Sequence, residues 1–157
     1  SIVFGFSFTD LVVFGIALNL VAGISTIFAG RLDDRFGPKN VIVVSVFGLV
    51  ACTLSVFFLV DLGIPMFWVA GLILAMFVGP AQAASRSFLA RVTPAGKEGE
   101  VFGLYATTGR AAGWMASLAW GVFIALAGSQ TLFGLLGIAL VLLVGGIMLL
   151  FVKAPAR

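Results

Sequence analysis

The sequence predicts an all-α integral membrane protein with five transmembrane helices. The chain of 157 residues is 62% apolar before its 20 glycines are counted and only 10% charged, whereas soluble domains are about 25% charged. Its charges leave five apolar segments of at least the roughly 20 residues that a spanning helix needs. Because backbone groups in lipid must be hydrogen-bonded internally, and barrel strands would alternate with polar residues, we expect these segments to be helices.

The five spans are separated by short outer turns and two longer inner connections. Only the fourth span is interrupted by a charge, at Arg110, and Gly63 and Pro65 provide turn residues on the outer side. The expected spans cover about residues 11–30, 41–60, 62–85, 101–127 and 131–152, and the inner connections cover residues 31–40 and 86–100.

Positive charges fall on one side of these spans. Eight of the nine Lys and Arg residues follow the first, third or fifth span, while Asp10, Asp61 and the turn at 128–130 lie on the other side. The positive-inside rule therefore predicts a multi-pass protein of the cell (inner) membrane with a cytoplasmic C-terminus. Arg86 and Arg91 are interpreted as topology charges or as gate residues. The one-sided cations are Arg31, Arg35, Lys39, Arg86, Arg91, Lys97, Lys153 and Arg157.

Residues for enzymatic or metal chemistry are missing from the sequence. It has no histidine and a single cysteine, Cys52, and none of its five expected spans contains Asp or Glu. Neither a metal site nor a nucleophile with its base can be assembled from this set, so no enzyme, catalytic residue, metal or cofactor is expected. The net charge of +3 follows from membrane topology and gives no reason to expect nucleic acid as a partner.

The first inner connection carries the most specific motif. Asp34 can accept hydrogen bonds from a helix N-terminus, whose dipole its charge complements, and Arg35 can reach a carboxylate or a carbonyl. The loop is either a conformational latch or a solvated charged turn, and its residues alone leave both open. The candidate latch residues are Gly30, where two helices are expected to meet, Asp34, Arg35, Gly37 and Lys39.

A break is predicted near the inner end of the third span, at Gly79 and Pro80. Proline removes a helical hydrogen bond, so the helix should bend or break there, although a tolerated kink without function is the alternative. Gln82 lies just beyond this point, and Asn19 lies in the middle of the first span. Each is a candidate ligand of a solute or, alternatively, an interhelical hydrogen-bonding residue.

Arg110 is the main candidate for solute binding. It lies nine positions after Val101, or about 13 Å deep in a hydrocarbon core of roughly 30 Å. A charge at that depth must face the protein interior or a watery cavity. It binds either an anionic group of a solute or a fixed carboxylate partner. The same span carries small residues that predict packing against other helices, namely Gly103, Gly109, Gly113 and Gly121.

The first inner connection resembles a motif of the major facilitator superfamily, roughly G-x-L-[small]-D-R-[aromatic or aliphatic]-G-[basic]-[basic]. In that family it lies between the second and third helices and again between the eighth and ninth. Asp33 and Pro38 depart from it, and four spans follow it, which resembles the second copy. The resemblance implies that residues 1–157 form most of the C-terminal six-helix bundle, helices eight to twelve, without the N-terminal half. The matching residues are Gly30, Leu32, Asp34, Arg35, Phe36, Gly37 and Lys39.

A second stretch is similar to the vacuolar amino-acid effluxer-like branch of that superfamily. The branch carries a Q-[AS]-x-S-R-S run, matched at residues 82–87, and an F-F-G-L-Y run before a basic residue, matched at residues 102–105 and Arg110. Val101 replaces the first Phe. The resemblance implies a secondary active transporter that moves a small solute, amino acids included, by alternating access. Its partners would be the solute, the lipid bilayer and the N-terminal half.

A second interpretation of the function remains possible besides transport. The chain begins at Ser1, and residues 1–9 read as the tail of an earlier apolar segment, so we expect a fragment. A truncated or half-size membrane protein with a scaffold or regulatory role, without transport of its own, is the alternative. The sequence upstream of Ser1 distinguishes the two, since six further spans with a second Gly-x-Leu-x-Asp-Arg loop favour a transporter.

Overall fold

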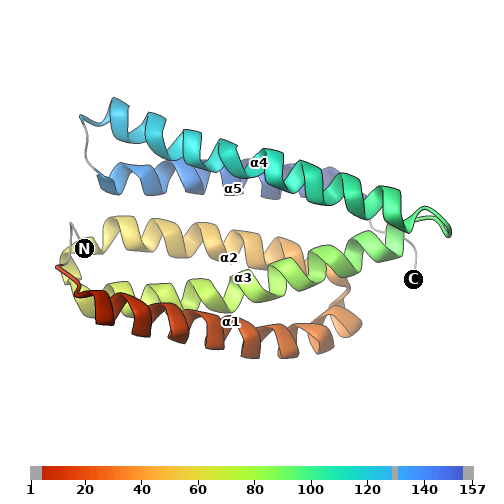
Figure 1. Cartoon of the computed structure of the whole chain (residues 1–157), viewed down its shortest axis with the longest axis horizontal. Helices are drawn as coiled ribbons and strands as arrows, with labels where there is room; N and C mark the ends of the chain where they lie inside the picture. Colours follow the sequence, from red (N-terminus) through yellow and green to blue (C-terminus); the bar gives the residue numbers. More distant parts are fainter. Residues whose placement is uncertain (1–4, 129–130, 154–157) are drawn as a thin grey trace.

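The computed structural model describes residues 5–128 and 131–153, and these residues form five long helices (Figure 1). All five are long and apolar enough to cross a membrane, and no strand occurs in the described part of the chain. The predicted all-α membrane fold is therefore confirmed. The helices are α1 (Phe8–Phe36), α2 (Pro38–Phe58), α3 (Ile64–Val92), α4 (Glu98–Leu126) and α5 (Gly134–Phe151), with short 3₁₀ turns η1 (Val60–Leu62) and η2 (Thr131–Phe133).

Four of the five helices, α1 to α4, extend further than the expected spans at their charged ends. α1 continues to Phe36 and α2 begins at Pro38, so most of the first inner connection is helical. Gly37 makes the turn with a φ of 85°, which glycine adopts without strain, and proline suits the first turn of α2. The second inner connection shrinks to residues 93–97. The length of an apolar segment predicts only the part of a helix that lies inside the hydrocarbon core. The helix itself continues into the polar interface.

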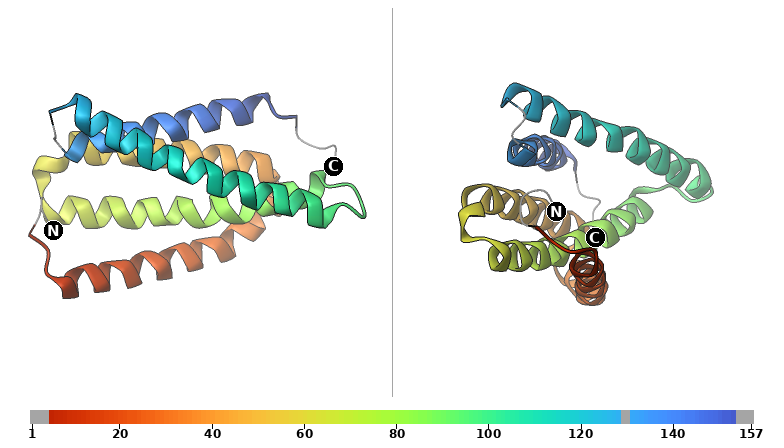
Figure 2. Two further views of the ribbon diagram at one scale, coloured as in Figure 1. Left: turned by 45° about the horizontal axis from the view of Figure 1, so that its top comes forward. Right: turned by 60° about the vertical axis from the view of Figure 1, so that its left-hand side comes forward.

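The helices pack in a row that curls on itself (Figure 2). α1 packs against α3, α3 against α2, α2 against α5, and α5 against α4. α1 and α4 therefore form the two flanks. The buried residues are mostly small or β-branched, and no large side chain among the described residues is fully buried. The helices are held by close backbone approach between small residues, which is the usual means of packing in a membrane.

α1 and α3 approach each other closely at Gly79. A Cβ atom placed there would collide with the carbonyl oxygen of Ala22 and lie 2.5 Å from the Thr26 hydroxyl and 2.9 Å from that of Ser25. α3 runs without interruption through Gly79 and Pro80, so the predicted break is not present. Gly79 lets α1 approach α3, and Pro80 is tolerated within the helix at the cost of one hydrogen bond.

The small residues of α4 do not pack as expected within this chain. A Cβ atom added at Gly103, Gly109, Gly113 or Gly121 would meet nothing within 4 Å, and no residue of α4 is buried. The contact of α4 with α5 is made near the C-terminal end of α4, where the backbone of Ala119 lies against Gly137 and the ring of Trp120 against Gly134. These four glycines of α4 are uncovered in the described residues.

The α1–α3 crossing gives a test of this packing. We expect Gly79→Ala to lower the free energy of unfolding by about 1–3 kcal/mol, because the new methyl group overpacks a backbone contact. Gly15→Ala, on the same pair of helices, adds a methyl group to open space and should have no such cost. Thermal unfolding of both variants in detergent measures the difference. Equal stabilities would show that the crossing is looser than described.

Candidate functional site

The described cations of the predicted inner connections gather at one end of the molecule, together with Asp33, Asp34, Glu98 and Glu100. Figure 1 shows that this end contains the C-terminus of α1, the start of α2, the end of α3 and the start of α4. Seven of the eight predicted one-sided cations lie at this end, and the eighth, Arg157, is outside the described residues. Asp10 and Asp61 lie at the opposite end, near the start of α1 and in η1. Residues 129–130 of the predicted outer turn are also outside the described residues.

Arg91, near the end of α3, connects to two adjacent carboxylates at the end of α1. Its guanidinium nitrogen lies 3.7 Å from an oxygen of Asp33 and 3.9 Å from one of Asp34. Asp33 is buried, with 8% of its surface exposed, whereas Asp34 is exposed. The same Asp33 oxygen has no hydrogen-bond partner among the described residues. Arg91 therefore provides the charge nearest to a buried carboxylate.

This arrangement differs from the predicted latch. The sequence pointed to Asp34 and Arg35 and treated Arg91 as a gate or topology charge, whereas Arg91 lies beside both acids and Asp33 is the buried one. Asp33 was not predicted as a latch residue, because it departs from the family motif. Helical periodicity could have found it, since Asp33 lies four residues after Ala29, a position on the packed side of α1.

The other predicted latch residues have separate surroundings. Lys39 donates from its ammonium group to the carbonyl oxygens of Leu150, at 3.1 Å, and Val152. These groups lie at the C-terminal end of α5, where helix carbonyls lack helical partners. Arg35 places its guanidinium carbon 5.4 Å from the centre of the Phe36 ring. A Cβ atom at Gly30 would meet nothing within 4 Å, so two helices do not meet there.

A polar groove of about 430 Å³ lies between α1 and α3. It brings together Asn19, Gln82 and Arg86, which were singled out separately in the sequence, beside the crossing at Gly79. Asn19 and Gln82 are exposed to the groove rather than buried between helices. The amide of Asn19 donates to the Gly15 carbonyl at 2.8 Å within its own helix. One amide hydrogen and the side-chain oxygen of Asn19 are thus left for another partner.

Arg110 lies apart from this groove, near the middle of α4. It is exposed, and no hydrogen bond or ion pair to it occurs among residues 5–128 and 131–153. Helical spacing places it on the side of α4 turned away from α5, together with Trp114 and several small or polar residues. The structure therefore joins Asn19 with Gln82 but does not join either with Arg110. The residues on that side are Gly103, Thr107, Trp114, Ser117 and Gly121.

Comparison with known proteins identifies the family of this chain. The family model described as Major Facilitator Superfamily matches residues 2–157. An uncharacterized MFS-type transporter, YxiO of Bacillus subtilis (strain 168), is 28% identical over 149 residues, which are 94% of this chain and 34% of that protein. The chain thus spans about a third of the length of this curated relative. No solved structure gives a significant match.

The ion pair at the inner end can be tested by a double-mutant cycle. We expect Arg91→Gln to lower the free energy of unfolding by about 1 kcal/mol, a modest value because Arg91 is 42% exposed and the contacts are longer than hydrogen bonds. In an Asp33→Asn background the same change should cost less, because the buried carboxylate is gone and only the exposed Asp34 remains beside Arg91. Arg86→Gln, on the same helix but in no ion pair with a described residue, is the matched control. Additive effects, or an equal loss for Arg86→Gln, would contradict the pairing.

Proposed function

This chain belongs to the Major Facilitator Superfamily, and on that premise we propose that it forms the C-terminal half, helices eight to twelve, of a secondary active transporter. The family match over essentially the whole chain carries this proposal. The parent protein would move a small solute by alternating access, in which two halves rock about a site near the midplane of the membrane. The chain itself would supply one wall of that site.

The distribution of charge supports the proposed orientation. The end of the molecule that carries the described cations of the inner connections also carries the end of α5. With cations retained in the cytoplasm, the C-terminus is cytoplasmic and the membrane is the cell (inner) membrane. The ion pair of Arg91 with Asp33 and Asp34 would then lie at the cytoplasmic surface, where a latch must open as access alternates. We assign the latch to these three residues, with Gly37 as its turn.

The solute site is proposed on two surfaces that the described part of the chain leaves open. One is the groove with Asn19 and Gln82, which supplies amide donors and acceptors. The other is the side of α4 that carries Arg110, a cation suited to a carboxylate. An amino acid or a similar small anion or zwitterion matches this pair of surfaces, which agrees with the resemblance to the amino-acid effluxer-like branch. The N-terminal half would close the cavity and cover the glycines of α4.

The Arg110 assignment predicts a loss of transport. We expect Arg110→Ala to reduce the transport efficiency of the full-length protein by about ten- to a hundredfold, the effect of losing a hydrogen bond to a charged group. Uptake or efflux of candidate amino acids, with surface expression checked, is the measurement. Lys97→Ala removes an exposed cation at the start of α4 and serves as the control. Unchanged kinetics in Arg110→Ala would refute the assignment. Full activity in Arg110→Lys would instead favour a fixed ion pair.

The groove residues predict a separate effect on affinity. We expect Asn19→Ala and Gln82→Ala each to raise KM by about two- to tenfold, since each removes one neutral hydrogen bond to the solute, while the latch and kcat stay largely intact. Ser55→Ala on α2, whose hydroxyl bonds to the Ala51 carbonyl within its own helix, is a control outside the groove. A change in kcat alone would place Asn19 and Gln82 in helix packing rather than in solute binding.

A further inference from the structure

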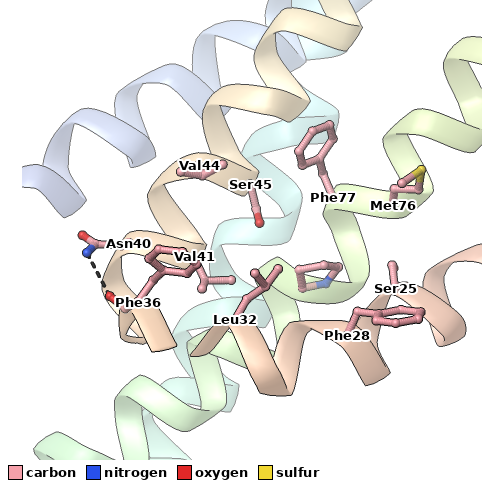
Figure 3. A pocket seen from close by; sticks show the side chains of 11 residues that line it. Ser25, Phe28, Leu32, Phe36, Asn40, Val41, Val44, Ser45, Met76 and Phe77 are labelled. Atoms are coloured by element: carbon pink, nitrogen blue, oxygen red, sulfur yellow. Dashed lines mark hydrogen bonds between the residues drawn. The ribbon is translucent and has the colours of Figure 1, made fainter. Parts of the chain in front are cut away.

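A second, apolar groove has no role in the proposed transport cycle. It lies where α1, α2 and α3 meet, measures about 560 Å³ and is lined almost entirely by apolar side chains. Phe28 lines it and is nine residues, or two and a half turns, from Asn19, so these two side chains lie on opposite faces of α1. Figure 3 shows Leu32 from α1, Val44 from α2 and Phe77 from α3 around the common space.

The length of this groove matches one leaflet of a bilayer. Its lining runs along α1 from Ser25 to Phe36, eleven residues or about 16 Å of helix. The hydrocarbon core is roughly 30 Å thick, so the groove reaches from the cationic end to about the midplane. A single acyl chain of a phospholipid occupies the same depth. The lining offers a charged solute few polar partners, because its polar side chains are Ser25, Asn40 and Ser45.

The mouth of the groove is polar and carries two exposed arginines, with the exposed Asp34 between them in the sequence. Phe36 and Asn40 lie together at this end in Figure 3, joined by a hydrogen bond of 2.9 Å from the Asn40 amide to the Phe36 carbonyl oxygen. The Arg35 guanidinium carbon lies 5.4 Å from the Phe36 ring centre, so the guanidinium is held beside a lining residue. Arg31, one turn earlier on α1, adds a second exposed cation. A lipid phosphate lies at the same depth, in the membrane interface, so these cations are placed to bind it.

We propose that this groove binds one acyl chain of an anionic phospholipid, with the lipid phosphate against Arg35 and Arg31. The chain fills the space among Leu32, Val44 and Phe77, and the glycerol region lies by Asn40. Guanidinium groups bind phosphate through charge-assisted, bidentate hydrogen bonds, and anionic lipids gain about 1 kcal/mol for each nearby cation. The site is independent of the solute site, since it faces away from Asn19 and Gln82.

Lipid retention by the purified full-length protein tests this site. Native mass spectrometry after mixing with phosphatidylglycerol or phosphatidylcholine of identical acyl chains gives the bound lipid directly. We expect preferential retention of phosphatidylglycerol, reduced about fivefold in Arg35→Gln, the fold-change for about 1 kcal/mol. Val44→Phe, at a lining position 64% exposed, should reduce retention of both lipids. Val13→Phe, at an α1 position 51% exposed and outside the groove lining, should not.

Three outcomes would overturn the proposal. Equal retention of both lipids by the unmodified protein would show that the arginines do not select the lipid phosphate. Equal losses of retained lipid in Val44→Phe and Val13→Phe would show that the lipid does not occupy the groove. A cross-link from Val44→Cys to another segment of the full-length protein, without retained lipid, would show that protein covers this face. Melting temperatures of all variants, measured in detergent alone, separate loss of lipid from loss of fold. None of these results depends on whether the protein transports a solute.

Discussion

The close approach of α3 to its two neighbours is the constraint on which the rest of the structure depends. Membrane helices gain little from hiding apolar surface from lipid, so they associate through tight backbone contacts. α3 provides these with Gly79 against α1 and with Phe77 against Gly48 of α2. Because α1 is held so close at Gly79, Asn19 and Gln82 face one groove on one side, and an apolar groove forms on the other. A bulkier residue at this crossing would move both.

The α1–α3 contact contains a buried carboxylate, that of Asp33. A carboxylate taken out of water costs several kcal/mol unless it is paired, and a single guanidinium 3.7 Å away compensates only part of that cost. The residual cost favours any state in which Asp33 regains water or gains a second donor. Arg91 is half-exposed and can follow the carboxylate. The pair is therefore suited to a latch that must release, whereas Lys39, bonded to the end of α5, suits a fixed attachment.

The number of helices and their common cationic end followed from the sequence, because apolar length and the placement of charge decide both. The pairing of Arg91 with Asp33 did not, since it depends on how two helices cross, which spacing within one helix does not determine. The sequence left open whether α3 breaks, bends or tolerates Pro80, because packing against two neighbours, which can outweigh one lost hydrogen bond, is decided by the fold. Asn19 and Gln82 were found singly, but only the fold shows that they share a groove.

Arg110 requires a polar or negatively charged environment from the molecules that surround this chain. A guanidinium at the centre of a spanning helix costs about 2.5–3.5 kcal/mol when it faces lipid, and the described residues provide it with no carboxylate. Apart from Trp114, the residues on the same side of α4 are small or polar, which suits water or a close helix better than acyl chains. Other apolar side chains of α4, such as Leu104 and Leu126, are exposed elsewhere on the helix. The helix therefore has one side suited to lipid and one suited to a wet cavity, and Arg110 lies on the latter.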